Sequence, residues 1–304
     1  MSTKYSPKIF PVLSLLISAS LWGIAWFPLR YLETNGLQGL WTSALIYSVP
    51  ALLASFLLIR RRKEILSQPG WLLLIAVGNA WCNVAFILAI LQGNVMRVLL
   101  LFYLSPLWAT LLAWLILNEH MSRLAALTLV IAMTGAAVML WDPSVGWPWP
   151  NSVADWLAIT SGMAFAFANV SVRKTQGVSI PVKNLFSWIG VSVLAIVWIL
   201  LSDAPYPTAS HEVMLWALLL GPVVVLVMTF TVQYGVTKLP VYRSAVILLF
   251  ELVAGAVSSQ LLTDEVMELN EWIGGGFIVL AAYLSARAYV HNSVIAKSKT
   301  KVIE

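Results

Sequence analysis

A carboxyl group in the middle of an apolar run has the clearest chemical potential in this sequence. Glu251 lies within VILLFELVAGAVSSQLL, and an unpaired carboxylate in hydrocarbon costs about 3 kcal/mol or more. Helical spacing places it on a stripe of small and polar residues with Ser244, Gly255 and Ser258. Such a group can carry a proton or balance a bound ammonium group, or it can be a structural acid that hydrogen-bonds a neighbouring helix.

Buried amides form a second group of candidates. Asn79 and Asn83 share one face of an apolar run near its middle, and Asn169 follows Phe165 by one helical turn in another. Amides in hydrocarbon require hydrogen-bond partners. These side chains could therefore bind an amino or carboxyl group, or equally hold helices together.

Aromatic side chains are abundant, with 15 Trp, 11 Phe and 9 Tyr. We expect most of them to serve packing or interfacial belts. Trp22 and Tyr103 lie deeper in their apolar runs. These two, with Trp26, could wall a cavity that accepts flat or cationic molecules, or could serve packing like the rest.

Helix-breaking residues and two arginines indicate candidate hinges and gates. Pro106, and the pair Gly221 and Pro222, lie inside apolar runs, where proline removes a backbone hydrogen bond and favours a kink or hinge. Arg97 and Arg243 each begin an apolar run. Their matching positions suggest a symmetric pair of gate salt bridges.

The sequence carries no enzyme signature. His120, His211 and His291 lie in separate loops or helix ends, and Cys82 is the only cysteine, so neither a catalytic triad nor a metal site is expected. A glycine-rich phosphate loop with a lysine is missing, which excludes an ATP-driven pump of that kind. We expect no enzyme, no cofactor and no metal.

The elements that carry these residues must be membrane helices. Apolar residues make up 60% of the 304 residues and charged residues 10%, and the mean hydropathy is +0.87, which excludes an ordinary soluble domain. A helix needs about 20 residues to cross roughly 30 Å of hydrocarbon. The basic residues flank apolar runs and form no basic face, so nucleic-acid binding is not expected. The apolar runs predict ten helices at 9–31, 38–59, 70–91, 95–117, 122–141, 153–172, 183–201, 212–235, 240–262 and 270–291.

The sequence indicates an internal duplication of one membrane unit. At an offset of 146 residues, Arg97 aligns with Arg243 and Glu119 aligns with Glu265. A unit with an odd number of spans inserts its second copy upside down. The predicted fold is an all-α integral membrane protein with ten transmembrane helices as two inverted five-helix repeats, at 1–146 and 147–292, followed by a basic cytoplasmic tail at 293–304.

The distribution of charge predicts the orientation. With a cytoplasmic N-terminus, every lysine and arginine except Arg30 and Arg97 falls on the inner side, as the positive-inside rule requires. We therefore expect a multi-pass protein of the cell (inner) membrane with both termini in the cytoplasm. Glu119 and Glu265 are expected to be structural, each at the N-terminus of the helix that follows it.

Two sequence runs resemble a known family. The runs YLSPLWATLLAWLILNEHMS and LLFELVAGAVSSQLLTDEVM, with ASLWGIAWFPLRYL in the first span, are similar to the drug/metabolite transporter superfamily, EamA type. Leu252 stands where the family pattern has a proline, which removes the usual reason for a kink in the ninth span. The resemblance covers nearly the whole chain and implies a ten-helix, two-repeat transporter of small metabolites.

The expected function is gradient-driven secondary transport by alternating access. The resemblance and the aromatic content favour export of small organic metabolites, leaning to hydrophobic or aromatic amino acids. Uptake of choline or another quaternary amine is the alternative within transport, because an aromatic cage with Glu251 suits such a cation. A non-transporting membrane sensor or assembly protein is the alternative from another class. The expected partners are a small-molecule substrate, the lipid bilayer and protons as coupling ion, with the oligomeric state left open.

Overall fold

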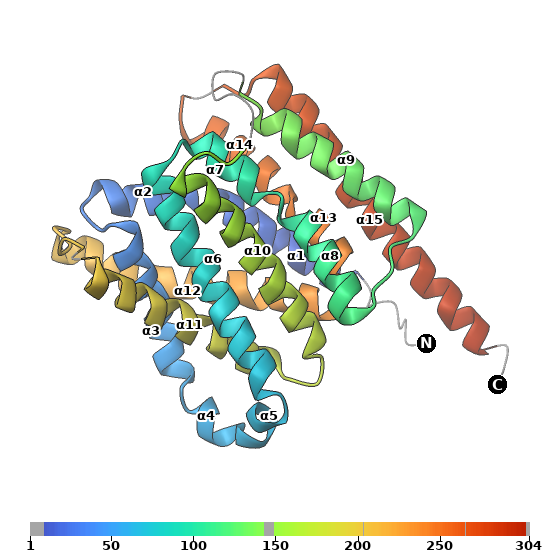
Figure 1. Cartoon of the computed structure of the whole chain (residues 1–304), viewed down its shortest axis with the longest axis horizontal. Coiled ribbons are helices and arrows are strands. Elements are labelled where there is room, and N and C mark those ends of the chain that lie inside the picture. The colour runs from blue at the N-terminus through green and yellow to red at the C-terminus, as the bar shows by residue number, and fades with distance from the viewer. Residues whose placement is uncertain (1–8, 143–148, 203, 265, 302–304) are drawn as a thin grey trace, which may run out of the picture.

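The computed structural model describes residues 9–142, 149–202, 204–264 and 266–301, and all regular elements among them are helices (Figure 1). The first half contains α1 (Phe10–Ile24), α2 (Trp26–Thr34), α3 (Gly39–Ala54), α4 (Leu57–Arg60), α5 (Arg62–Ser67), α6 (Pro69–Gln92), α7 (Val95–Phe102), α8 (Ser105–Leu117) and α9 (Arg123–Leu140). The second half contains α10 (Val153–Lys174), α11 (Ile180–Leu201), α12 (His211–Lys238), α13 (Val241–Leu248), α14 (Phe250–Leu262) and α15 (Leu269–Lys301). The expected boundary after residue 146 lies outside the described residues.

These helices confirm the predicted spans. Within the described residues, nine helical segments are long and apolar enough to cross a membrane, counting α1 with α2, α7 with α8, and α13 with α14 as one span each. The one predicted span not among these nine is the second, at 38–59, which contains α3, a shorter apolar helix of 16 residues. The last helix extends beyond its predicted end and continues to Lys301. The fold is therefore an all-helical membrane protein, with two halves consistent with inverted repeats.

Polar side chains cap the helices at the turns between spans. Asn94, Ser122 and Ser210 accept hydrogen bonds from the first turns of α7, α9 and α12. Ser152 and Asp155 form a capping box at the start of α10. Each cap satisfies backbone N–H groups that a helix leaves without a partner.

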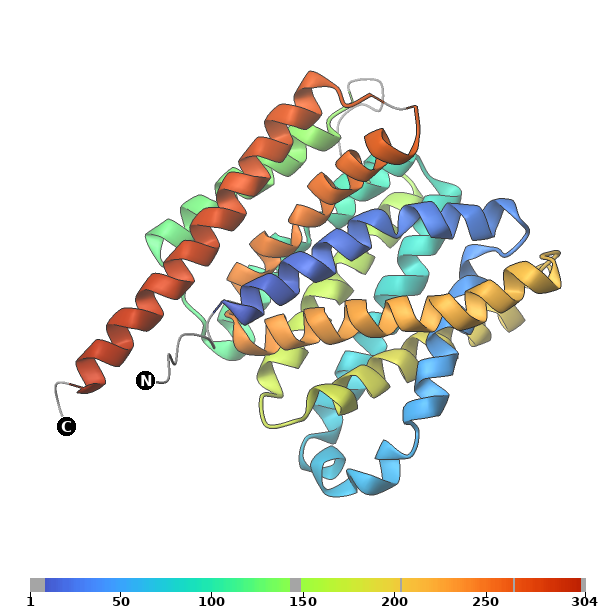
Figure 2. The same ribbon diagram turned by 180° about the vertical axis from the view of Figure 1, so that it is seen from behind.

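The packing of the helices follows a two-fold pattern. Helix α10 packs along α6 and also along α7 and α8, and correspondingly α1 packs along α12 and also along α13 and α14. Further large contacts pair α3 with α11 and α9 with α15, the second and fifth spans of each half, and α6 also packs along α11. Helices α9 and α15 lie side by side along one edge in both views (Figures 1 and 2).

Three of the long spans are broken, and two of them at matching places; the first span also breaks, at Ala25 between α1 and α2, but its counterpart α10 is continuous. The fourth span breaks at Tyr103 and Leu104, between α7 and α8, and the ninth breaks at Leu249, between α13 and α14. In each break a backbone N–H bonds three residues back, from Leu107 to Leu104 at 3.0 Å and from Leu252 to Leu249 at 3.1 Å. Such tighter turns interrupt an α-helix. The repeat offset of 146 residues thus relates Tyr103 to Leu249.

Proline explains only one of the breaks. Pro106 has no N–H to bond the carbonyl of Phe102, so the fourth span cannot continue as a regular helix. The ninth span breaks although Leu252 replaces the proline. Its break must therefore come from tertiary contacts, which the missing proline did not predict.

Glycines of the first and sixth spans press on the two broken helices. A Cβ on Gly162 of α10 would lie 2.6 Å from the Phe102 carbonyl oxygen, and one on Gly23 of α1 would lie 2.5 Å from the Glu251 carbonyl oxygen. No other residue type allows backbones to approach this closely. These glycines let one helix of each half rest on the broken helix of the other half.

The expected hinge at Gly221 and Pro222 lies inside a continuous helix. Helix α12 runs from His211 to Lys238 with Pro222 in its interior. A Cβ on Gly221 would clash with the side chain of Ile46 in α3. Close packing on α3 therefore explains the glycine, and a hinge at this point stays a prediction.

The contact between α9 and α15 provides a test of the packing. A Cβ on Gly274 would collide with the Gly135 carbonyl and with Met139, whereas a Cβ on Gly276 of the same helix meets nothing within 4 Å. We expect Gly274→Ala to lower the stability of the purified protein by about 1–3 kcal/mol. Gly276→Ala should be neutral or slightly stabilising, because alanine favours a helix. Equal unfolding midpoints for the two variants would contradict this packing.

Candidate functional site

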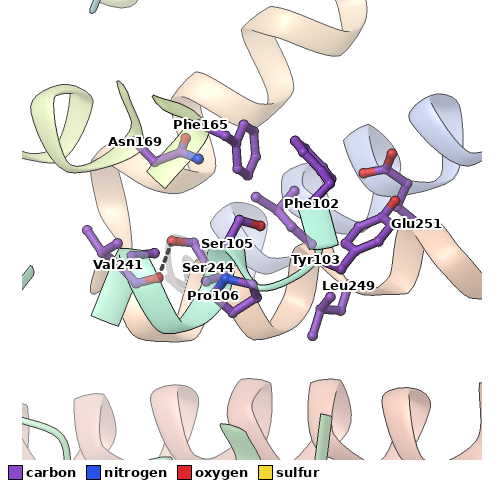
Figure 3. Close-up of a pocket in the computed structure, with 13 residues that line it drawn as sticks. Phe102, Tyr103, Ser105, Pro106, Phe165, Asn169, Val241, Ser244, Leu249 and Glu251 are labelled. Carbon is purple, nitrogen blue, oxygen red and sulfur yellow. Dashed lines mark hydrogen bonds between the residues drawn. The ribbon is translucent and has the colours of Figure 1, made fainter. Parts of the chain in front are cut away.

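A small cavity lies between the two broken helices and α10 (Figure 3). Its volume is about 20 Å³, enough for about one water molecule. Both halves of the chain contribute to its wall, so it lies at their junction. The lining residues are Phe102, Tyr103, Ser105, Pro106, Ala109, Phe165, Asn169, Val241, Ser244, Ala245, Leu248, Leu249 and Glu251.

The repeat offset relates facing parts of this wall. The offset of 146 residues aligns Phe102 with Leu248, Tyr103 with Leu249, and Ser105 with Glu251. All six residues line the cavity. The two helix breaks therefore frame one cavity from the two halves. Its chemistry is asymmetric, because a carboxyl group in one half corresponds to a hydroxyl group in the other.

Glu251 is the ionisable group of the wall. It lies in the first turn of α14, directly after the break. The phenol ring of Tyr103 points toward its carboxyl group (Figure 3). The described structure contains no basic side chain in an ion pair with Glu251. A carboxyl group in the membrane interior with no counter-ion can accept a proton or bind a cation.

Three aromatic rings follow one another along the cavity wall, starting from Tyr103 beside Glu251. The centroid of the Phe102 ring lies 5.2 Å from that of Tyr103 and 5.9 Å from that of Phe165. The sequence pointed to Tyr103 and Phe165 but missed Phe102. The repeat offset could have identified it, because it aligns Phe102 with Leu248, one turn before Glu251.

Two polar side chains complete the wall on the side of α10 and α13. Asn169 makes no side-chain hydrogen bond with the described residues, so its amide is free to bind a polar group. The Ser244 hydroxyl donates 2.9 Å to the carbonyl of Val241 on its own helix and retains its capacity to accept. The cavity thus combines acid, amide, hydroxyl and aromatic groups.

Three of the predicted binding residues do not line the cavity. Asn79 donates to the Ser187 hydroxyl at 3.2 Å and to the Ile75 carbonyl at 2.8 Å, which joins α6 to α11. The side-chain oxygen of Asn83 is buried without a partner among the described residues. Trp22 is partly buried in α1 outside the cavity wall. A binding role for these three residues stays a prediction.

An ion pair joins the fourth and sixth spans at one end of the bundle. The Arg97 Nε donates 2.8 Å to Asp155 Oδ1, and these side chains are 9% and 2% exposed. Asp155 also accepts from the backbone N–H groups of Asn151 and Ser152, and the Arg97 Nη2 donates to the carbonyl of Trp149. The guanidinium is therefore tied both to the start of α10 and to the segment that precedes it.

A second ion pair joins the same two spans at their other end. Arg173 Nε, near the end of α10, donates 2.9 Å to Glu119 Oε1, just after α8. The Arg173 Nη1 donates 2.8 Å to the Thr237 carbonyl, and the Val241 N–H donates 2.8 Å to Glu119 Oε2. This network adjoins the cavity through Val241, which lines its wall.

Glu119 corrects one expectation. It was expected at the N-terminus of the next helix, but Ser122 caps α9 and Glu119 bonds the first N–H of α13, in the other half of the chain. The favourable meeting of a carboxylate with a helix N-terminus is present, but between different helices. The corresponding Glu265 lies outside the described residues.

Of the two expected gate salt bridges, the described residues form the one at Arg97 but not the one at Arg243. Arg97 pairs with Asp155, whereas Arg243 forms no ion pair within the described residues. Its guanidinium instead donates 3.2 Å to the Ser285 carbonyl. A gate role for Arg97 alone stays a prediction.

Comparisons with known proteins agree with this architecture. The sequence profile of the EamA-like transporter family matches residues 9–141 and 152–287. A solved structure, described only as a crystal structure of a protein, has a TM-score of 0.72 at 16% sequence identity and covers 92% of this chain and 96% of its own. At that identity the likeness shows the fold alone.

A curated relative matches more weakly. An uncharacterized transporter of Pseudomonas aeruginosa, PA0485, is 24% identical over 151 residues, which are 48% of this chain and 47% of the relative. The match spans about half the length of that relative. The two family matches cover both halves of the chain, and the family is one of transporters rather than enzymes. This multi-pass membrane protein therefore belongs to the EamA-like transporter family, within the drug/metabolite transporter superfamily.

Proposed function

We propose that this protein is a gradient-driven exporter of small organic metabolites, with hydrophobic or aromatic amino acids as the preferred class. The observation that carries the proposal is the pair of helix breaks at Tyr103 and Leu249, which meet at one cavity between the two halves. In many secondary transporters, interrupted helices form the substrate site at the interface of inverted repeats.

The chemistry of the wall supports an amino acid as cargo. Glu251 can balance an ammonium group, and the amide of Asn169 can bind a carboxylate. Phe102, Tyr103 and Phe165 offer aromatic surface for an apolar side chain. The present cavity is too small for such a molecule, so binding requires the two halves to separate.

The two ion pairs are suited to control that separation. Arg97 with Asp155 and Arg173 with Glu119 close opposite ends of the contact between the fourth and sixth spans. In an inner membrane with both termini cytoplasmic, the Glu119 network faces the cytoplasm. Alternating access then corresponds to breaking one network while the other stays closed.

Uptake of choline or another quaternary amine is the second candidate. Tyr103 beside the Glu251 carboxyl group, with Phe102 and Phe165 along the same wall, offers the kind of aromatic surface that binds a quaternary ammonium ion. Asn169 has no evident role for such a cargo, which favours the amino acid.

Transport by protein reconstituted into liposomes distinguishes these candidates. We would measure the flux of labelled phenylalanine, leucine, alanine, choline and glucose with and without a pH gradient. Flux of the aromatic amino acid, driven by the gradient, is the expected result. Flux of choline alone would establish the second candidate, and no flux of any solute would favour a non-transporting role.

Replacement of the central acid tests its role. Glu251→Gln keeps the shape of the side chain but cannot ionise, so we expect at least a tenfold loss of flux and loss of its pH dependence, because a charge-assisted hydrogen bond to the cargo disappears. The control is Glu212→Gln at an exposed position of α12. Reduced expression with an unchanged pH profile would instead indicate a structural acid.

Cysteine accessibility tests the gates. In a Cys82→Ala background, Ala109→Cys places a thiol in the cavity wall, and an impermeant maleimide is applied to vesicles of either orientation. Arg173→Gln should raise labelling from the Glu119 side, and Asp155→Asn should raise it from the opposite side. Arg61→Gln, which breaks an exposed pair of 3.8 Å, should change neither. If neither Arg173→Gln nor Asp155→Asn changes the labelling of the thiol, the two ion pairs do not act as gates.

A further inference from the structure

Two arginines related by the repeat are buried to the same extent but have different partners. Arg97 in α7 and Arg243 in α13 are separated by 146 residues and are 9% and 7% exposed. A buried charge is costly unless it is paired and hydrogen-bonded. Arg97 meets this condition through Asp155, and Arg243 does not meet it within the described residues.

The difference lies in one edge of the guanidinium. In Arg97, Nε donates to the Asp155 carboxylate and Nη2 to a carbonyl. In Arg243, Nη1 donates 3.2 Å to the Ser285 carbonyl, whereas Nε is buried without a hydrogen-bond partner among the described residues. The edge formed by Nε and Nη2 is one that binds a carboxylate or phosphate through two parallel hydrogen bonds.

Aromatic rings hold this guanidinium in place. The centroids of the Tyr242 and Tyr289 rings lie 5.8 Å and 5.9 Å from the Arg243 carbon Cζ. Ring faces attract a cation but carry no net charge. They fix the position of the guanidinium and leave its charge uncompensated.

The sequence offers no substitute for Asp155 in the first span. At the offset of 141 residues that aligns the first span with the sixth, Asp155 corresponds to Ser14, and the chain contains no acidic residue before Glu33. The counterpart of the Arg97 ion pair is therefore missing from the sequence itself. An anion from outside the chain would restore it.

We propose that Arg243, framed by Tyr242 and Tyr289, binds a phosphate-type oxyanion at the end of the bundle where α13 begins. Lys238 at the end of α12 adds positive charge at this end of the bundle. The orientation proposed above places this end at the cytoplasmic leaflet, where phosphatidylglycerol-type headgroups are available. A lipid headgroup and free phosphate offer the same oxygen atoms to the guanidinium.

Thermal unfolding of the purified full-length protein in detergent tests the site. The probes are dioleoylphosphatidylglycerol, dioleoylphosphatidylcholine and sodium phosphate, each titrated at constant ionic strength. Arg243→Gln should bind the anionic probe at least tenfold more weakly than the wild type, since it loses a charge-assisted bidentate contact. Arg243→Lys keeps the charge but lacks the Nε edge, so its affinity for the anionic probe should lie between those of the wild type and Arg243→Gln. Arg287→Gln, an exposed arginine on the neighbouring helix, should behave as the wild type.

Each outcome decides between alternatives. Stabilisation that depends on Arg243 and is specific for phosphatidylglycerol identifies a lipid headgroup as the ligand, whereas equal stabilisation by inorganic phosphate identifies a soluble anion. The proposal is overturned if all variants respond as the wild type does, or if no probe stabilises the wild type. Arg243→Lys keeps the test valid should Arg243→Gln fail to fold.

Discussion

Backbone hydrogen bonding in hydrocarbon is the constraint on which this structure depends. A transmembrane helix cannot break against lipid, because the released N–H and C=O groups would have no partner there. The two breaks related by the repeat lie inside the bundle, with Tyr103 and Leu249 buried. Gly162 and Gly23 bring neighbouring helices against the carbonyls next to these breaks. Interior space and irregular backbone therefore occur at the same place.

The two halves share a scaffold but differ in chemistry. Equivalent positions of the broken helices face the same cavity, yet one carries Ser105 and the other Glu251. Likewise Arg97 has an acidic partner in Asp155, and Arg243 has none among the described residues. Duplication supplies the geometry of such a protein, and divergence of single side chains gives its two halves different chemistry.

Much of the fold followed from the sequence because membrane helices leave strong local signals. Length and hydropathy predicted all ten spans, since each must cover the hydrocarbon by itself. The spacing of Arg97 and Arg243 revealed the duplication. The stripe around Glu251 correctly indicated an inward-facing side chain, because a carboxyl group facing lipid would be too costly.

The partners of these residues depended on the tertiary structure. Glu119 caps α13 instead of the adjacent helix, and the ninth span breaks without a proline, because contacts between distant helices decide both. Phe102 joins the cavity while Asn79 instead bonds a neighbouring helix. The sequence by itself determined which segments cross the membrane, that they repeat, and which polar groups must avoid lipid. Only the tertiary structure decided which of those groups meet, since helices of similar apolar character can pack in many arrangements, and hydrogen bonds and ion pairs between them are not local in sequence.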